Sequence, residues 1–506
     1  MRNLLKASQV RDADAYTIAN EPIASIDLME RASRAFVEKL FRLSIVQKEQ
    51  PILICCGTGN NGGDGLAIAR MLYEQGFSAL DIWVLYYNDR QSADFKTNLM
   101  RIEALDIKVW SFFPADSLPV VTQDVIIDAL LGSGLNKPLA GAWLKAVQHL
   151  NQAKKTTVAV DIPTGMLADG QLETSREVLY AQDVITFQRP KISFLFPESA
   201  RCMERFHVVD IGLDERFIAQ QEVDFYEVTT GDVRRIYKNR HPFSHKGTYG
   251  HALLVAGSEG TLGAALLCAE ACLFAGAGLT SASIPRSGLA ALNTRLPEVM
   301  TINREALFQQ PLNKYHALGI GPGLGTDSEA KGLVSDMIEQ FTGPTVVDAD
   351  ALHVLANEKE LLDRLSRGTV LTPHMKEFDR LFGQHHTWWA RVERAKSEAS
   401  RRKLVIVLKN RFTFIAVPDG KVYMNFTGNP AMASGGMGDA LTGIIVSFLA
   451  QGYEPKEAAI LGCYIHGKAG DVLNETGMAV IPASILISEV PKVIGWFESR
   501  VTIGEE

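Results

Sequence analysis

The sequence predicts an α/β protein of two domains, each built on a doubly wound, largely parallel β-sheet. Short apolar segments alternate with segments of helical length in two separate series, which is typical of βαβ units with both sheet faces covered. The chain has 506 residues, 46% of them hydrophobic, and about 150 residues per domain suggests two to four domains. A polar segment, residues 214–240, separates the two series. We place the boundary inside it and predict domains of residues 1–222 and 223–506.

The first domain begins with two amphipathic segments, residues 8–19 and 25–43, which predict helices. A glycine-rich segment, GTGNNGGDG at residues 57–65, precedes a helical pattern, so we expect a loop there. Strands are expected at six apolar segments: residues 51–56, 80–87, 124–130, 156–162, 183–187 and 205–211.

The second domain repeats the α/β alternation with different segments. Pro-Asp-Gly within residues 411–426 predicts the turn of a hairpin. The very apolar segment of residues 263–284 carries Glu270 and several glycines, so we expect a buried helix followed by a strand and not a membrane span. Further strands are expected at residues 250–257, 315–321, 345–350, 368–373 and 403–409, and a last helix at about 438–452.

Composition excludes some classes of partner. The net charge is −7 and the sequence pI is about 5.9, so there is no electrostatic reason to expect nucleic acid or an anionic membrane. The N-terminal residues contain no apolar core of a secretory signal. The six cysteines lie in apolar surroundings without zinc-site or CxxC spacing, which predicts reduced core residues and a cytoplasmic location.

The first glycine-rich segment follows a strand and precedes a helix, an arrangement that brings backbone N–H groups close to a phosphate. A plain tight turn is an equally good interpretation of the glycines. Asn60, Asn61 and Asp64 stand where a dinucleotide fingerprint would leave room for a pyrophosphate. Asp64 would repel a phosphate unless a cation or hydroxyl-rich group lay between them.

Three strand ends of the first domain carry oxygen-bearing side chains. Asn61, Asp128, Asp161 and Thr164 follow strands whose carboxyl ends meet at one edge of the predicted sheet. Each could be a helix N-cap, which is the commoner role of such residues. Together they are hard oxygen ligands that suit Na⁺, K⁺, Mg²⁺ or Ca²⁺ but not zinc.

The motifs NNGGDGL, DALLGSGL and DIPTG resemble the Rossmann-like N-terminal domain of the NAD(P)HX epimerases. The resemblance implies potassium bound by Asn61, Asp128 and Thr164, although many members have serine where Thr164 stands. For the proton transfer of the epimerase reaction we choose Asp161 over Asp64. The resemblance also implies substrate contacts at Asn60, Asn61, Gly62, Gly63, Asp64, Gly132, Ser133, Gly134, Leu135, Asn136, Lys137, Pro138 and Asp161.

The second glycine-rich segment, SGGMGDALTG, precedes a helix near the end of the chain. Its N–H groups and the helix dipole would stabilise negative charge on a transferring phosphoryl group. Asp439 could take a proton from an attacking hydroxyl. The alternative is that Asp439 only caps the helix, but the glycine run exceeds what a cap requires.

This motif resembles the anion hole and base of the ribokinase-like superfamily, an α/β/α sandwich. VAGSEGTLGAALL, GIGPGLG, LTPHMKEFDRLFG and VLKNRFTFI resemble its NAD(P)H-hydrate dehydratase branch. His374 alone could equally be a helix cap, and Met437 replaces a small residue and narrows the pocket. The implied contacts to the hydrated nicotinamide are Ala264, Gly323, His374 and Asp439. The implied contacts to the adenine nucleotide are Lys409, Asn410, Arg411, Phe412, Thr413 and Gly438.

Both sets of motifs in one chain resemble the bifunctional NAD(P)H-hydrate repair enzymes. The resemblance implies epimerisation of R- and S-NAD(P)HX, followed by ADP-dependent dehydration of the S form to NAD(P)H with release of AMP and phosphate. It implies K⁺ in the first domain, Mg²⁺ and ADP in the second, and a second copy of the chain in a homo-oligomer. Two alternatives stay open: a small-alcohol kinase with a fused regulatory domain, and a nucleotide sensor without catalysis.

Overall fold

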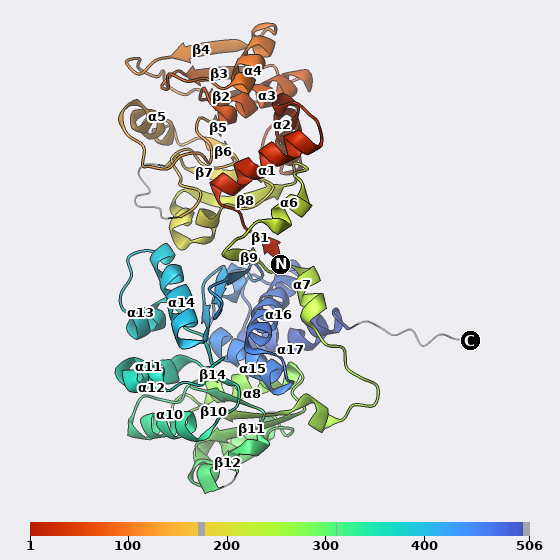
Figure 1. Cartoon of the computed structure of the whole chain (residues 1–506), viewed down its shortest axis with the longest axis vertical. Coiled ribbons are helices and arrows are strands. Elements are labelled where there is room, and N and C mark those ends of the chain that lie inside the picture. Colours follow the sequence, from red (N-terminus) through yellow and green to blue (C-terminus); the bar gives the residue numbers. More distant parts are fainter. Residues whose placement is uncertain (171–177, 310, 499–506) are drawn as a thin grey trace, which may run out of the picture. The chain divides into compact units, whose positions relative to one another are not determined.

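The computed structural model describes residues 1–170, 178–309 and 311–498. The chain divides into two compact units (Figure 1). The first contains Asn3–Val223 together with Thr387–Trp389, and the second contains Met1–Arg2 and the rest of the chain from Asp224 onward. Within the described ranges, no helix is long and apolar enough to cross a membrane.

The first unit holds a parallel sheet with the strand order β4-β3-β2-β5-β6-β7-β8. The six expected strands are confirmed, and β4 is an additional edge strand that we did not predict. Its sequence, KVWSF, is largely exposed and lacks the apolar run of a buried strand. The strands are β2 (Ile52–Cys56), β3 (Leu80–Leu85), β4 (Lys108–Phe112), β5 (Val125–Ala129), β6 (Thr156–Val160), β7 (Ala181–Phe187) and β8 (Met203–Val209).

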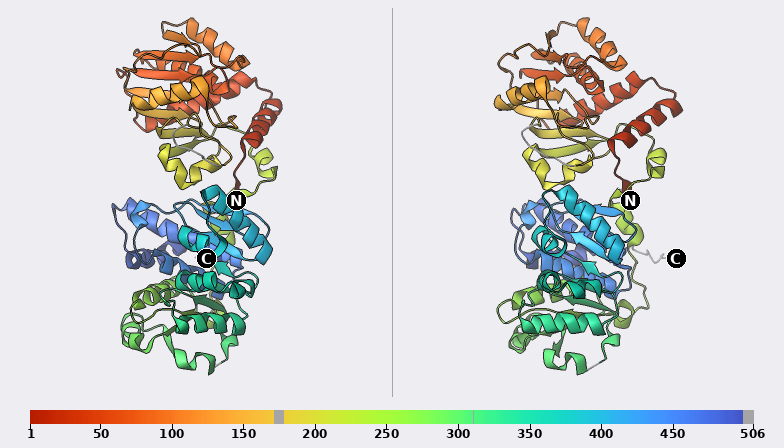
Figure 2. Two further views of the ribbon diagram at one scale, coloured as in Figure 1. Left: turned by 90° about the vertical axis from the view of Figure 1, so that its left-hand side faces the viewer. Right: turned by 60° about the vertical axis from the view of Figure 1, so that its left-hand side comes forward.

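Helices cover both faces of this sheet (Figures 1 and 2). Because side chains alternate along a strand, Leu53 and Cys55 of β2 pack towards α5, whereas Ile54 and Cys56 lie against α3. Helices α2 and α4 pack on α3. The helices are α1 (Ala7–Asn20), α2 (Ser25–Arg42), α3 (Asn60–Glu74), α4 (Ala93–Glu103), α5 (Gly141–Gln152) and α6 (Glu215–Gln220).

The predicted loop at residues 57–65 was partly wrong, because α3 already begins at Asn60. Glycine is unfavourable inside a helix, but packing requires it here. A Cβ atom on Gly62 would lie 1.8 Å from the Gly57 carbonyl oxygen, and one on Gly65 would lie 2.5 Å from Ala129 Cβ. The glycines therefore let the first turns of α3 approach the ends of β2 and β5.

The second unit holds an eleven-stranded sheet in the order β1-β9-β18-β17-β16-β15-β14-β13-β10-β11-β12. The expected strands are confirmed, and the Pro-Asp-Gly turn joins the antiparallel pair β17 and β18. The short strands β1, β9 and β12 were not predicted. The strands are β1 (Arg2–Asn3), β9 (Phe225–Glu227), β10 (His251–Val255), β11 (Leu279–Ile284), β12 (Met300–Asn303), β13 (Ala317–Ile320), β14 (Thr345–Val347), β15 (Val370–Leu371), β16 (Val405–Leu408), β17 (Thr413–Ala416) and β18 (Val422–Asn425).

Two helical layers flank this second sheet (Figures 1 and 2). Helices α8, α15, α16 and α17 share the main core with Leu254, Val346 and Val407. Helices α10 to α14 lie on the opposite face. The helices are α7 (Thr230–Ile236), α8 (Leu262–Phe274), α9 (Leu289–Arg295), α10 (Ser328–Gln340), α11 (Ala349–Asn357), α12 (Lys359–Asp363), α13 (Met375–Phe382), α14 (Trp388–Arg402), α15 (Met437–Ala450), α16 (Pro455–Glu475) and α17 (Ala483–Gly495).

The polar segment at residues 214–240 is ordered and belongs to both units. It contains α6 of the first unit, then β9, which pairs in parallel with β18 of the second sheet. The six cysteines are buried and free, as predicted.

Candidate active sites

The first site lies at the carboxyl ends of β5 and β6, where Asp128 and Thr164 are directly joined. Thr164 Oγ1 donates to Asp128 Oδ1 over 2.7 Å, and the Thr164 backbone N–H donates to Asp128 Oδ2 over 2.8 Å. Both residues are completely buried. Burial raises the pKa of Asp128 to about 6, and the hydrogen bonds from Thr164 oppose that rise. The sheet therefore brings together two of the three predicted cation ligands.

Asn61 completes this group from the first turn of α3. A Cβ atom on Gly132 would lie 3.2 Å from Asn61 Cβ and 3.5 Å from Asn61 Oδ1, so the two residues are in contact. Leu131 N–H, one residue before Gly132, donates to Thr164 Oγ1 over 3.0 Å. Asn61 Nδ2 is buried without a hydrogen-bond partner.

These residues fit a monovalent cation of the potassium type. The group offers a carboxylate, a hydroxyl and an amide, which supply hard oxygens. The unpaired amide of Asn61 needs a polar partner, and the oxygen and nitrogen of an amide can exchange places by a flip. Within the described residues, no cluster of three or more His, Cys, Asp or Glu side chains could hold a metal.

Asp161 follows β6 and has a backbone φ of +64°, which is uncommon for a residue other than glycine. Its Oδ1 atom accepts hydrogen bonds from Thr186 Oγ1 and the Phe187 backbone N–H, each over 3.1 Å. Lys191 Nζ lies 2.6 Å from the same oxygen. The carboxylate of Asp161 is thus held at the edge of the sheet by β7 and the segment after it.

Two further carboxyls face Asp161. Burial and then the charge of Asp161 raise the pKa of Asp14 in α1 to about 6. Burial and then Asp161 also raise the pKa of Asp64 well above its usual value. The sequence drew attention to Asp64, but neither Asp14 nor Lys191 stood out, because each lies far along the chain from the motifs.

A cavity of about 450 Å³ adjoins this region and is lined by the segment Ser133–Asn136. Ser8 and Arg11 of α1 line it as well. Gly132, Lys137 and Pro138 are not among the lining residues, so the middle of the predicted substrate segment faces the cavity and its ends do not.

The second site lies at the N-terminus of α15. The helix begins at Met437, one residue earlier than expected, after Gly436 with a φ of +87°. That conformation favours glycine. Asp439 is in the first turn, and burial, followed by repulsion from Asp348, raises its pKa to about 6. The glycine N–H groups and a carboxyl of unusually high basicity therefore lie together.

Lys409 brings a positive charge to the same place. Its Nζ atom donates to Asp348 Oδ1 over 2.9 Å, and Thr442 Oγ1 of α15 donates to Asp348 Oδ2 over 2.7 Å. A Cβ atom on Gly438 would lie 3.3 Å from Lys409 Nζ. Burial alone would lower the pKa of Lys409, but Asp348 and Glu377 outweigh that effect and raise it.

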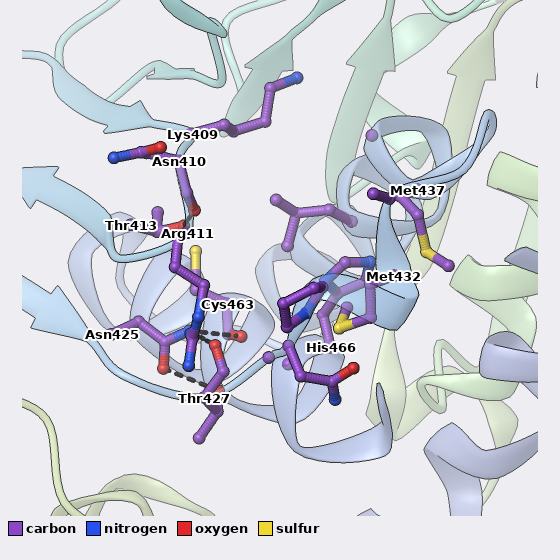
Figure 3. A pocket seen from close by; sticks show the side chains of 17 residues that line it. Lys409, Asn410, Arg411, Thr413, Asn425, Thr427, Met432, Met437, Cys463 and His466 are labelled. Atoms are coloured by element: carbon purple, nitrogen blue, oxygen red, sulfur yellow. Dashed lines mark hydrogen bonds between the residues drawn. The ribbon is translucent and has the colours of Figure 1, made fainter. Parts of the chain in front are cut away.

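A cavity of about 510 Å³ opens beside Lys409 and Gly438 (Figure 3). Lys409, Asn410, Arg411 and Thr413, four of the implied contacts to the adenine nucleotide, line this cavity. Phe412 does not line it, and its ring packs against Phe426 instead, with the centroids 5.2 Å apart. Met437, which we expected at the pocket, lines it as well. The lining residues that we did not predict are Asn425, Thr427, Gly428, Asn429, Pro430, Met432, Ala433, Leu441, Cys463, His466 and Gly467.

Comparison with known proteins assigns both halves. A family model described as NAD(P)H-hydrate dehydratase matches residues 252–492, and one described as YjeF-related protein N-terminus matches residues 25–193. The bifunctional NAD(P)H-hydrate repair enzyme Nnr of Moorella thermoacetica is 35% identical, with 98% of each chain covered. The protein of the same name from Vibrio cholerae is 35% identical, over 96% of this chain and 97% of its own.

The chain belongs to the family of bifunctional NAD(P)H-hydrate repair enzymes. The predicted family and fold class are thereby confirmed, with a Rossmann-like first half and a ribokinase-like second half. Among solved structures, an ADP/ATP-dependent NAD(P)H-hydrate dehydratase from Bacillus subtilis, co-crystallised with ATP and Mg²⁺, is 34% identical. It covers 53% of this chain and 98% of its own, with a TM-score of 0.49.

Ala264, Gly323 and His374 are the other residues that the family resemblance implied for the hydrated nicotinamide. Ala264 and Gly323 are neighbours, because a Cβ atom on Gly323 would lie 2.9 Å from Ala264 Cβ. His374 pairs with Lys409 in a β-bridge and caps α13 through Nδ1, which accepts from the Lys376 and Glu377 N–H groups. His374 can therefore cap α13 and also stand beside Lys409 at the second site.

Proposed function

We propose that the chain repairs hydrated nicotinamide nucleotides in two reactions. Residues 1–222 would interconvert the R and S forms of NAD(P)HX. Residues 223–506 would dehydrate the S form with ADP as phosphoryl donor. The observation that carries the proposal is the placement of Asp439 at the glycine-rich start of α15, with the Lys409 ammonium beside Gly438.

The dehydration needs a better leaving group than hydroxide. Asp439 takes the proton of the C6 hydroxyl while the oxygen of that hydroxyl attacks the terminal phosphorus of ADP. A C6–O–P ester forms. The bond between the terminal phosphorus and the bridging oxygen of ADP breaks, and AMP leaves. The nitrogen lone pair of the ring then expels phosphate from C6, and loss of a proton from C5 restores NAD(P)H. A base with a pKa of about 6 is largely ionised at neutral pH.

The surrounding groups stabilise charge that develops on the transferring phosphoryl group. The N–H groups at the start of α15 point to that position. Lys409 supplies a full positive charge, and Asp348 holds its ammonium in place through the bond to Oδ1. Thr442 binds the other oxygen of Asp348, which leaves that carboxylate fully engaged.

The nucleotide would occupy the cavity lined by Lys409–Arg411 and Thr413. Its phosphates would lie at Gly438, and the apolar side chains of Met432, Met437 and Leu441 would contact the nucleotide. Mg²⁺ would enter with the nucleotide, because this ion prefers phosphate oxygens and water.

The epimerase site would hold K⁺ between Asn61, Asp128 and Thr164. Such an ion supplies a fixed positive charge that orients substrate oxygens. Asp161 would move the proton at the C6 hydroxyl. The segment Ser133–Asn136 lines the adjoining cavity and would contact the dinucleotide.

One assay tests the whole proposal. The protein is incubated with Mg²⁺, ADP and a mixture of chemically hydrated NADH isomers, and the absorbance of the restored dihydronicotinamide is followed. Complete recovery of both isomers, with AMP formed, is expected. A stable phosphorylated product without NADH would instead identify a kinase, and tight binding with no turnover would identify a sensor.

A further inference from the structure

A buried ion pair lies at the carboxyl end of β6. Lys191 Nζ is 2.6 Å from Asp161 Oδ1, and the side chains of Lys191 and Asp161 are only 4% and 12% exposed. A buried ammonium is costly unless a carboxylate faces it. A buried ion pair such as Lys191–Asp161 therefore often has a functional role in addition to any effect on stability.

Only one oxygen of Asp161 is engaged by the chain. Oδ1 accepts from Thr186 Oγ1, the Phe187 N–H and Lys191 Nζ. Within the described ranges no hydrogen bond to Oδ2 is found. The three bonds fix the plane of the carboxylate and leave one oxygen for a ligand. The left-handed backbone conformation of Asp161 is a second constraint on the orientation of its side chain.

The Lys191 ammonium interacts with two carboxyls, those of Asp161 and Asp14. Its charge lowers the pKa of Asp14, which burial and Asp161 together raise to about 6. Asp64 of α3 adds a third carboxyl, and its pKa is raised by burial and then by Asp161 and Asp14. Without Lys191, Asp161 Oδ1 would keep the hydrogen bonds from Thr186 and Phe187 but lose its ammonium partner, while the carboxyls of Asp14 and Asp64 would remain close.

We infer that Lys191 is a positioning residue for the epimerase reaction, holding the Asp161 carboxylate through Oδ1 so that its free oxygen is directed at the substrate. The inference rests on the proposed function. The C6 carbon of the hydrate carries both a hydroxyl and the ring nitrogen, so it is a hemiaminal. Asp161 Oδ2 takes the hydroxyl proton, the C6–N1 bond breaks, and N1 receives that proton while C6 becomes an aldehyde. Ring closure on the opposite face reverses the transfers and inverts C6.

The test uses the full-length protein and the Lys191→Met variant. The kcat and KM for interconversion of R- and S-NADHX are measured, and dehydration of S-NADHX in the same preparation shows that the second unit is intact. The kcat for interconversion should fall about 100-fold, the value of a well-placed proton-transfer group, with KM little changed.

Two further variants sharpen the result. Lys191→Arg retains the charge and a hydrogen-bond donor for Asp161 Oδ1, and should restore part of kcat. Lys145→Met removes an exposed lysine of α5 and should leave every value unchanged. An unaltered kcat in Lys191→Met would overturn the inference. A loss of kcat that arginine does not restore, or that comes with an equally large rise in KM, would overturn it too. If the wild-type protein fails to interconvert the isomers, the proposed function itself fails.

Discussion

Lys409 Nζ lies 2.9 Å from Asp348 Oδ1, although 61 residues separate the two along the chain. The resemblance grouped Lys409 with contacts to the adenine nucleotide. The contact with Asp348 holds its ammonium beside Gly438, at the start of α15. We therefore expect Lys409 to act on the phosphoryl group that is transferred, and not on the base or sugar of the nucleotide.

Replacing Lys409 by methionine should lower kcat/KM for dehydration about 100- to 1,000-fold, because a preorganised charge at a transition state is worth that much. Binding of ADP should weaken far less. Rates and ADP affinity can be measured separately, by absorbance and by calorimetry. The exposed Lys359→Met is the matched control, and equal losses in binding and rate would argue for a general binding role.

In the Asp439→Asn variant, kcat for dehydration should fall about 1,000-fold or more, while epimerisation continues. The wild-type rate should also depend on pH. Because burial raises the pKa of Asp439 to about 6, the ionised base is lost as the pH falls through that value, and kcat should decline below it. A flat profile between pH 5 and 8, with chemistry rate-limiting, would contradict the assignment.

Asp128 should determine how strongly the epimerase reaction depends on the K⁺ concentration. In Asp128→Ala, the K⁺ concentration for half-maximal epimerisation should rise at least about tenfold, since even outer-shell changes have that effect. The Thr164 and Leu130 N–H groups also lose their acceptor, so stability should fall by about 1–3 kcal/mol. Epimerase rates in K⁺ and Na⁺ series measure the first effect. The exposed Asp124→Ala should change neither value, and a K⁺-independent wild-type enzyme would refute the site.

Gly62→Ala should destabilise the first unit by at least about 3 kcal/mol, at the upper end of overpacking costs. Its Cβ atom would lie 1.8 Å from a backbone oxygen, which cannot move aside as a side chain can. Gly134 has no atom within 4 Å of the corresponding position, so Gly134→Ala should be close to neutral. Chemical denaturation of both variants gives the comparison, and similar stabilities would show that α3 can shift without cost.

The phosphate chain of the donor should be selected by length. Gly438 and Met437 line the same cavity, which would hold both the adenosine and the phosphates of the donor. Two phosphates would place the terminal phosphoryl group at the glycine N–H groups, whereas three would have to buckle. We expect ADP to give faster dehydration than ATP, with AMP as product. Matched assays with the two donors decide this, and a higher rate with ATP would leave the repair function but reverse the donor preference.

Local pattern was sufficient for much of the fold and for parts of both sites. Apolar alternation located the buried strands, because strands covered on both faces must be apolar throughout. Glycines followed by Asp439 indicated a phosphoryl-transfer site, since the chemistry needs free N–H groups next to a base. Edge strands such as β4 were missed because their half-exposed sequences carry no such signal.

The pairing of distant residues was decided by the tertiary structure alone. Sequence motifs named Asp161 and Lys409, but their partners Lys191 and Asp348 lie on other strand ends, and no local rule connects them. The order of strands in each sheet brings these ends together. The helical start of α3 depends in the same way on how closely Gly62 and Gly65 approach β2 and β5. Chemistry could therefore be inferred from short segments of sequence, whereas the charges that tune it depend on contacts that form only when the sheets assemble.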